Sequence, residues 1–381
     1  ILYWQGSRLK MSYKIKIVMG PKSYLNEFLN KPYITLEDYV IKIDSLTRNL
    51  VEKFTDNDYE EILKDKIILA KTESYSGITS AALSNFIQIV NKSIEFGNGI
   101  ILQNPPKSVI NQIKSHFDEN QYAFCEYKYP KLDLEVLLNI KERSTEQLFG
   151  QVNAIKRILA SLYKLTKESR KPIVLMLYGP SGVGKTEMSK IISECIGGEL
   201  FRKQMSMNKT NYMFDYIFGN NHGEPSLARD LLERESNIVL FDEFDKGVNE
   251  INSAFYQLFD EGIFEDSQYE VKMGNSIIIC TSNFKGELQI RRELGDPIYY
   301  RFDDFIEFSE LNKEAKKSIL TKILSDEFIK LSDNEKSLLP SEESLLEQYV
   351  IKINQFTNYR HMQKLVENDI NLRLISTLMG F

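Results

Sequence analysis

The chain has 381 residues, of which 42% are hydrophobic and 27% charged, and its formal net charge is −6. This length exceeds one ordinary hydrophobic core, so two or three domains are expected. The acidic balance argues against a general nucleic-acid-binding protein. No apolar stretch approaches the roughly 18 residues that a membrane-spanning helix needs, so we expect no membrane partner. The three cysteines have no metal-type spacing, which favours a reducing compartment, and a cytoplasmic protein is expected. They are Cys125, Cys195 and Cys280.

The first ten residues have the character of an artificial leader. The sequence Leu2-Tyr3-Trp4-Gln5-Gly6-Ser7 resembles the recognition site of a protease that is used to remove affinity tags. We therefore expect residues 1–10 to be a tag remnant and the natural chain to start at Met11. A natural N-terminus is the alternative.

Residues 11–131 are expected to form a small mixed α/β or α+β domain that contacts a partner or adaptor. They contain no catalytic signature, and the chain shows no internal repeat in its sequence. Strands are predicted at residues 13–19, 100–102 and 123–129, and helical patterns at residues 36–69, 80–93 and 109–117.

The strongest motif of the chain follows an apolar run at residues 173–178. The sequence Gly179-Pro180-Ser181-Gly182-Val183-Gly184-Lys185-Thr186 fits G-x-x-x-x-G-K-[ST] at every fixed position. A strand, a glycine-rich turn and a helix that starts near Gly184 are the context this motif requires. Glycines let backbone N–H groups surround a phosphate chain. Lys185 adds a cation at the terminal phosphates, and the Thr186 hydroxyl is a candidate Mg²⁺ ligand.

A second apolar run, at residues 238–241, ends in two carboxylates. In a doubly wound sheet, ligands bind at the carboxyl edge of the strands, where Asp242 and Glu243 are expected. Asp242 is predicted to hold Mg²⁺, directly or through water, and Glu243 to orient and polarise the attacking water. A strand that simply ends in solvent is the alternative.

A third buried strand is predicted at residues 276–283, and it ends in polar residues. Asn283 is a candidate for contact with the γ-phosphate or the water, although it can also be an ordinary turn residue. Further strands are expected at residues 199–205 and 304–308, a hairpin at 262–273, and helices over most of 312–381. The predicted fold is a three-layer α/β P-loop sandwich around a parallel sheet (residues 132–308), followed by a helical lid (residues 309–381).

Several separate motifs together resemble the AAA+ module of Clp-type ATPases, and most closely the second ATPase module of ClpB-like disaggregases. The resemblance covers roughly residues 146–381. It is carried by Gly179–Thr186, Leu240-Phe241-Asp242-Glu243-Phe244-Asp245-Lys246, Phe255-x-x-Leu258-Phe259-Asp260-Glu261-Gly262, Asp266-Ser267-Gln268 and Thr281-Ser282-Asn283. The N-terminal domain does not resemble the Clp N-domain.

The resemblance implies roles for individual residues. Gly150 and Gln151 would border the adenine, Gly179–Thr186 would be the Walker A loop, Asp242 and Glu243 the Walker B pair, and Asn283 sensor 1. Arg301, in Tyr300-Arg301-Phe302-Asp303, would be the arginine finger, with Arg291 and Arg292 as runners-up. Arg360 would be sensor 2, although the glycine that precedes it in the family is absent. Surface salt bridges are the alternative roles for Arg301 and Arg360.

One departure from the family concerns the pore loop. The family's aromatic Gly-Tyr-Val-Gly loop is replaced by a shorter segment that contains His222 and lacks the tyrosine. The aromatics Tyr212, Phe214, Tyr216 and Phe218 are interpreted mainly as core residues. The resemblance implies a ring-forming homo-oligomer, with a hexamer favoured, which uses Mg²⁺ and ATP to remodel a protein partner through its N-terminal domain and pore. The alternative is an ATP-dependent assembly switch or scaffold that controls an effector without threading polypeptide. A nucleic-acid motor is disfavoured because no basic-aromatic stripe is present.

Overall fold

The computed structural model describes residues 13–47, 55–167, 171–207, 211–219, 223–247 and 249–380. The predicted tag remnant at residues 1–10 and the loop residue His222 lie outside these ranges. The chain divides into two compact units. The first comprises the described residues of Ile1–Pro130, Asn208–Asn237 and Val248–Gly274, and the second those of Lys131–Met207, Ile238–Gly247 and Asn275–Phe381.

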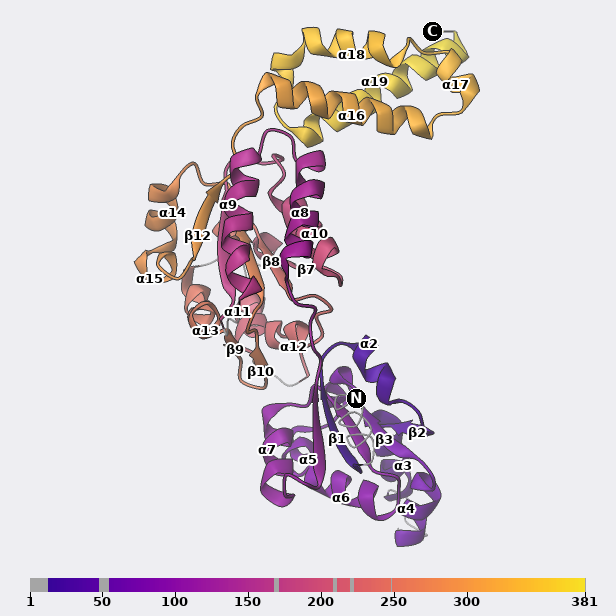
Figure 1. The fold of residues 1–381 in the computed structure, drawn as a ribbon. Coiled ribbons are helices and arrows are strands. Elements are labelled where there is room, and N and C mark those ends of the chain that lie inside the picture. Colours follow the sequence, from indigo (N-terminus) through magenta and orange to yellow (C-terminus); the bar gives the residue numbers. More distant parts are fainter. Residues whose placement is uncertain are drawn as a thin grey trace. The chain divides into compact units, whose positions relative to one another are not determined.

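The first unit is built on a five-stranded sheet in the order β2-β3-β4-β1-β5, in which every pair is parallel (Figure 1). The strands are β1 (Ile15–Met19), β2 (Tyr33–Thr35), β3 (Ile67–Ala70), β4 (Ile100–Gln103) and β5 (Tyr122–Glu126). The helices between them are α2 (Lys22–Leu25), α3 (Leu36–Thr47), α4 (Asp56–Leu63), α5 (Ser80–Ser84), α6 (Ile87–Glu95) and α7 (Lys107–His116). β3 and β4 are buried along their whole length, as parallel strands covered on both faces require.

The predicted helical pattern over residues 36–69 is wrong at its end. Ile67–Ala70 forms strand β3, which pairs with β2 and β4. An apolar run of this length has no periodicity that separates a buried strand from a helix, so only the sheet pairing decides its structure.

The first unit also contains segments from the middle of the chain. These are α11 (Asn211–Phe218), α12 (Leu227–Leu232), α13 (Tyr256–Glu261) and the predicted hairpin, which is confirmed as β9 (Ile263–Glu265) and β10 (Glu270–Lys272). The core interpretation of the aromatic run is right for Tyr216, which is 3% exposed. It is wrong for Phe214 and Phe218, which are exposed and stack on each other.

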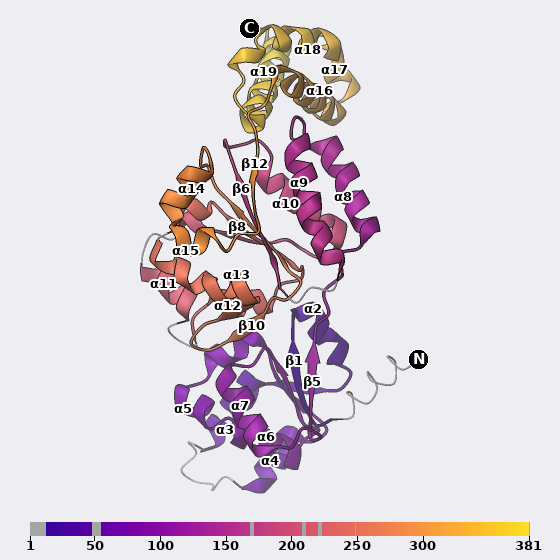
Figure 2. The same cartoon turned by 60° about the vertical axis from the view of Figure 1, so that its left-hand side comes forward.

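The second unit contains a parallel sheet in the order β12-β6-β11-β8-β7. Figure 2 shows β6 beside β12. The strands are β6 (Ile173–Tyr178), β7 (Phe201–Gln204), β8 (Ile238–Asp242), β11 (Ile277–Thr281) and β12 (Asp304–Glu307). The helices are α8 (Leu134–Gln147), α9 (Val152–Leu162), α10 (Lys185–Ile196), α14 (Glu287–Leu294) and α15 (Asp296–Tyr299). The predicted α/β sandwich around a parallel sheet is confirmed.

A helical lid completes the second unit. It consists of α16 (Lys313–Lys330), α17 (Asp333–Ser337), α18 (Glu342–Ile351) and α19 (Tyr359–Met379). Buried Leu320 and Leu324 of α16 belong to the same core as Met362 and Val366 of α19. Within the described parts of the chain, no helix has the length and apolar character needed to cross a membrane.

Candidate nucleotide-binding site

The glycine-rich turn between β6 and α10 takes a backbone path that only glycines follow easily. Gly179, Gly182 and Gly184 have φ angles of 125°, 73° and 110°. A Cβ atom at Gly179 would lie 2.2 Å from the carbonyl oxygen of Phe308, which follows the neighbouring strand β12. The turn therefore presents backbone groups, rather than side chains, at the start of α10, as a phosphate-binding loop requires.

Lys185, the first residue of α10, is 8% exposed and folds back over the turn. Its Nζ donates to the carbonyl oxygens of Gly179 and Pro180 (2.7 Å each) and to Asn283 Oδ1 (3.2 Å). Burial lowers the pKa of Lys185 to about 8, and the positive charge of Arg360 acts in the same direction. The ammonium group therefore lies where a polyanion would stabilise its charged form.

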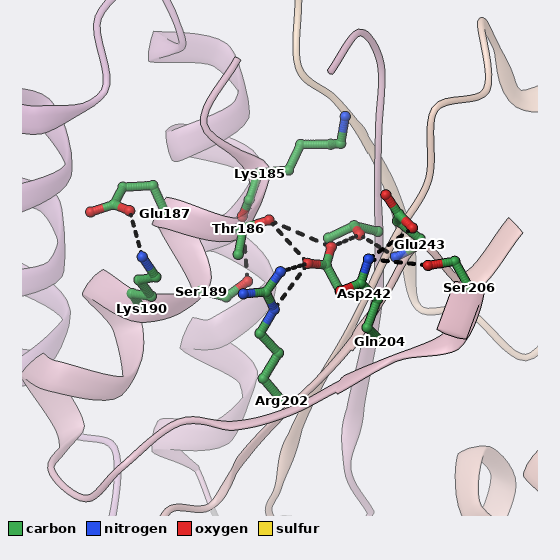
Figure 3. Close-up of polar contacts among 11 residues, drawn as sticks. Lys185, Thr186, Glu187, Ser189, Lys190, Arg202, Gln204, Ser206, Asp242 and Glu243 are labelled. Atoms are coloured by element: carbon green, nitrogen blue, oxygen red, sulfur yellow. Dashed lines mark hydrogen bonds and ion pairs between the residues drawn. The ribbon is translucent and has the colours of Figure 1, made fainter. Parts of the chain in front are cut away.

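Thr186 and Asp242 meet at the carboxyl edge of the sheet (Figure 3). The Thr186 hydroxyl is 3.5 Å from each carboxylate oxygen of Asp242. Asp242 is 6% exposed and accepts from Arg202 Nε (3.0 Å) and Thr281 Oγ1 (2.5 Å). A hydroxyl and a carboxylate in this position are oxygen ligands of the kind that Mg²⁺ prefers.

Glu243 leaves the end of β8 in a left-handed conformation, with φ 55°. Its backbone N–H donates to Thr281 Oγ1 (2.9 Å), and its Oε2 accepts from Gln204 Nε2 (3.1 Å). Hydrogen bonds from Ser206 and then Gln204 lower the pKa of the Glu243 carboxyl. Both donors come from β7 or the turn that follows it (Figure 3). Glu243 is therefore held as an ionised base beside Asp242.

The start of α19 approaches the glycine-rich turn from the lid. The backbone N–H of Tyr359 donates to the carbonyl oxygen of Gly182 (3.2 Å). A Cβ atom at Gly182 would lie 2.9 Å from Cγ of Asn358, so this glycine permits the close approach. Arg360, the second residue of α19, consequently lines the same cleft as Lys185.

These residues surround a cleft of about 530 Å³. It brings together most of the site residues predicted from the sequence, namely Ser181, Gly182, Val183, Gly184, Lys185, Thr186, Asp242, Glu243, Asn283 and Arg360. Gly179 and Pro180 contribute the carbonyl oxygens that hold Lys185. Among the residues that the structure describes, no group of three or more His, Cys, Asp or Glu side chains is arranged to hold a metal ion.

Like Gly179 and Pro180, the predicted residues Gly150, Gln151 and Arg301 are not among those that line this cleft. Gln151 is 2% exposed and both donates to and accepts from the backbone of Ser309 (2.9 and 3.1 Å). Gly150 lies against Ala315, and the cleft wall next to it is formed by Gln147, Leu148 and Phe149. Arg301 lies between α15 and β12 and donates to the carbonyl oxygen of Pro297 in α15.

Sequence reasoning missed the polar side chains of β7 and the end of β11. Arg202 and Gln204 contact Asp242 and Glu243, and Thr281 contacts both. The signal available in the sequence was the alternation Arg202-x-Gln204 at the end of a short strand. It becomes informative only with the pairing of Gln204 opposite Asp242 in the sheet.

The chain is similar to several known proteins. Residues 170–330 match the family described as AAA domain (Cdc48 subfamily). A chaperone protein ClpB of Chlamydia trachomatis serovar D is 30% identical over 329 residues, which cover 81% of this chain and 35% of that protein. The ClpB of Mycoplasmoides gallisepticum is 28% identical over 273 residues, covering 63% of this chain and 37% of that protein. An ATP-dependent Clp protease ATP-binding subunit ClpL of Staphylococcus aureus is 28% identical over 220 residues, which cover 51% of this chain and 31% of that protein.

The chain thus spans about a third of the length of the curated relatives it matches. Among solved structures, the closed-state cryo-electron-microscopy reconstruction of Hsp104 with ATPγS and FITC casein has a TM-score of 0.55 at 13% identity. That match covers 99% of this chain and 91% of the other, and at this identity it supports the fold alone. The motifs, the sheet order and the relatives together place the chain in the AAA+ family, as an ATPase of the Clp type.

Proposed function

We propose that this protein is a Mg²⁺-dependent ATP hydrolase that forms a ring and uses the energy of hydrolysis to remodel a protein partner. The observation that carries the proposal is the convergence of Lys185, Thr186, Asp242 and Glu243 on one cleft, next to Arg360 of the lid. The relatives named as chaperones support protein remodelling as the output.

The donor set at the edge of the sheet fits Mg²⁺. The Thr186 hydroxyl and the Asp242 carboxylate would hold the ion, which supplies positive charge for the phosphate oxygens. Arg202 and Thr281 already orient the Asp242 carboxylate.

The roles of the remaining residues follow from their chemistry. Glu243 orients the attacking water and accepts its proton, because its lowered pKa keeps it ionised at neutral pH. Lys185 exchanges its contacts with Gly179 and Pro180 for the terminal phosphates. Asn283, now hydrogen-bonded to Lys185, is positioned to contact the γ-phosphate or the water. Arg360 connects the nucleotide to the lid, so hydrolysis can move the lid helices.

The ring is proposed to complete each site from the neighbouring subunit. Arg301 is the candidate finger, and groups of this kind accelerate phosphoryl transfer by about 10³–10⁵. A hexamer is the expected homo-oligomer, and the N-terminal domain is the expected contact for the protein partner.

A second candidate is an ATP-dependent assembly switch that restrains or displays an effector without threading a polypeptide. The feature that favours it is the short segment at residues 219–225, which lacks the tyrosine of the Clp pore loop. The intact Glu243 weighs against a scaffold that never hydrolyses ATP.

The test is ATP turnover per chain, measured with Mg²⁺ over a range of protein concentrations. A rise in specific activity with concentration supports a ring whose sites are shared. Constant activity means that each chain holds a complete site and removes Arg301 from the finger role. Binding without turnover at every concentration favours the switch, and an absence of ATP binding refutes both candidates.

A further inference from the structure

The sheet of the first unit has the same strand order as the sheet that carries the nucleotide cleft. When the strands of each are numbered along the chain, both sheets have the order 5-1-4-3-2, with every neighbouring pair parallel. One sheet is β5-β1-β4-β3-β2 and the other is β12-β6-β11-β8-β7. We call residues 15–126 the N-terminal core and the second sheet with its loops the nucleotide core.

Matching Val18 of β1 to Leu177 of β6 fixes which residues correspond in the remaining strands, because each strand is placed by its pairing with a neighbour. The corresponding pairs are Val18↔Gln103 and Leu177↔Thr281, Met19↔Glu126 and Tyr178↔Glu307, Ile68↔Ile100 and Val239↔Ile278, and Ile34↔Ile68 and Phe201↔Val239. A shared strand order can arise independently, and the pairings alone can always be matched in this way, so the strand ends are the independent check. Under this match β1, β4 and β5 end at Met19, Gln103 and Glu126, which correspond to Tyr178, Thr281 and Glu307, the ends of β6, β11 and β12.

The turn after the first strand supports the same alignment. β1 is followed by Gly20-Pro21-Lys22-Ser23, and β6 by Gly179-Pro180, four further residues, and then Lys185-Thr186. Gly20 and Gly179 both have positive φ angles (146° and 125°). The backbone N–H of Tyr127 donates to Met19 O just as that of Phe308 donates to Tyr178 O, each at 2.8 Å. The N-terminal core thus keeps the Gly-Pro start of the loop and a following Lys-Ser pair. It lacks the four residues between them that would surround the phosphates.

The alignment also shows which residues stand where the catalytic groups would be. Extended from the paired strands, it places Lys71 at the position of Asp242, Thr72 at that of Glu243, and Pro105 at that of Asn283. A lysine in place of the metal-binding aspartate opposes a divalent cation, and a threonine cannot act as the carboxylate base.

The corresponding edge of the N-terminal core is closed by its own side chains. Asn104 Oδ1 accepts from Gly20 N (2.8 Å), and its Nδ2 donates to Gly20 O (2.9 Å) and to Thr72 Oγ1 (3.0 Å). A Cβ atom at Gly20 would lie 2.5 Å from Cβ of Tyr127. Hydrogen bonds of Asn104 therefore join the segments that follow β1, β3 and β4 directly. At the corresponding edge, the nucleotide core has its cleft.

The loops at this edge contact other segments of the first unit. Ser23, in the short helix α2 that follows the turn after β1, donates to the Glu235 carboxylate (2.9 Å). Ser76, after β3, accepts from Arg229 Nη1 (3.0 Å). Lys107, after β4, donates through its backbone N–H to Gln268 O (2.8 Å) and through Nζ to Asp266 O (2.7 Å). In the N-terminal core, the segments after β1, β3 and β4 correspond to those that face the cleft in the nucleotide core. All three contact other protein segments instead.

We propose that residues 15–126 are a second copy of the P-loop core that binds no nucleotide, and that its sheet edge has become a docking surface for the chain's own segments at residues 227–235 and 263–272. The proposal goes beyond ATP hydrolysis, since it assigns a structural function to a region without a catalytic signature.

The first test is hydrogen–deuterium exchange on the full chain, with and without Mg²⁺ and a non-hydrolysable ATP analogue. We expect about tenfold slower exchange, or about 1.4 kcal/mol, at residues 179–187. Residues 19–25, 70–74 and 103–107 should be unchanged. Protection of these N-terminal segments overturns the inference. An absence of protection in both cores refutes the proposed ATPase instead, which separates the two outcomes.

A matched pair of variants tests the same point by binding. Lys185→Ala should lose nucleotide binding, whereas Lys22→Ala, at the equivalent place in the N-terminal core, should bind like the unmodified chain. Nucleotide binding that survives Lys185→Ala and disappears in Lys22→Ala would contradict the proposal.

The docking surface is tested with the triple variant Ser23→Ala, Ser76→Ala, Lys107→Ala. Exchange at residues 227–235 and 263–272 should become about tenfold faster, while the central strand at residues 100–103 stays protected. The control is Ser23→Thr, Ser76→Thr, Lys107→Arg, which retains the hydroxyls and the charge and should restore slow exchange. Unchanged exchange in the triple alanine variant overturns the docking function.

Discussion

Glu243 depends on two donors that come from a neighbouring strand and turn rather than from its own strand. Gln204 donates to its carboxylate, and Ser206 is the larger cause of its lowered pKa. Its left-handed backbone, with φ 55°, turns the residue away from the direction of β8. Such a conformation is uncommon outside glycine, and it persists because Thr281 accepts from the Glu243 backbone N–H.

The substitution Glu243→Gln tests this role. It keeps the shape and the hydrogen-bonding capacity of the side chain but removes the base, so ATP binding should persist while turnover falls by about 10²–10⁴. Steady-state ATPase rates and equilibrium binding measure the two effects separately. Glu142→Gln, on the exposed surface of α8, is the control and should leave both unchanged. Full turnover in the Glu243 variant would exclude the catalytic role.

Lys185 predicts a dependence of ATP binding on pH. Burial disfavours the cation and lowers its pKa to about 8, and bound phosphates would raise that pKa. Below pH 8 the lysine is already charged, so affinity should be independent of its titration. Above pH 8 binding must take up a proton, and affinity should fall by up to about tenfold per pH unit.

Isothermal titration calorimetry measures this proton uptake directly. Titrations at pH 7 and pH 9, each in two buffers of different ionisation enthalpy, should give little uptake at pH 7 and close to one proton at pH 9. Equal uptake at both values would mean that Lys185 does not change its protonation when the nucleotide binds.

At the scale of single elements, helix α19 connects the lid to the glycine-rich turn. Asn358 caps this helix by accepting from His361 N (3.0 Å), and the next residue donates its N–H to Gly182 O. The cap therefore fixes the point where Arg360 enters the cleft.

Replacing Asn358 with alanine should weaken both the helix and the site. Loss of an N-cap costs about 0.5–2 kcal/mol, so urea unfolding should shift to lower denaturant and ATP should bind more weakly. Asn358→Ser keeps an acceptor and should recover most of both losses. An alanine variant with lower stability but unchanged ATP affinity would separate the cap from the nucleotide site.

The sequence predicts some of these elements well and others poorly, for physical reasons. β6, β8 and β11 are apolar runs that end in motif residues, so their type and position follow from local pattern. β3 is an equally apolar run with no such motif, and it was assigned to a helix. Arg202 reaches Asp242 only because β7 pairs with β8 across a long separation in sequence, which no local pattern encodes.

The N-terminal core shows the same limit at a larger scale. Its strands have three to five residues, and its glycine loop is too short to match the phosphate-loop motif. The repeat is therefore not recognisable in the sequence, and only the strand order and the positions of the strand ends reveal it. The fold persists in this copy because buried apolar positions tolerate substitution by other apolar residues. The phosphate-binding and catalytic residues have been replaced.

For the whole molecule, the central prediction concerns sites shared between subunits. Arg301→Ala keeps Glu243, and Glu243→Gln keeps Arg301, so each variant alone should be nearly inactive. When they are mixed, roughly a quarter of randomly formed interfaces pair an intact Glu243 with an intact Arg301. ATP turnover of the mixture should therefore exceed the sum of the separate variants.

The control mixture combines Glu243→Gln with Lys185→Ala, whose defects lie in the same site and cannot complement across an interface. A rise only in the first mixture supports Arg301 as a group that acts in trans. The same low activity in both mixtures would place Arg301 outside the shared site.

The contacts of Lys185 bear on how a nucleotide leaves the cleft. Its ammonium group is already satisfied by two carbonyl oxygens and Asn283, so departure of a nucleotide leaves no orphaned buried donor. We expect ADP to leave without an exchange factor, so that the supply of fresh ATP, rather than a release partner, resets the cycle.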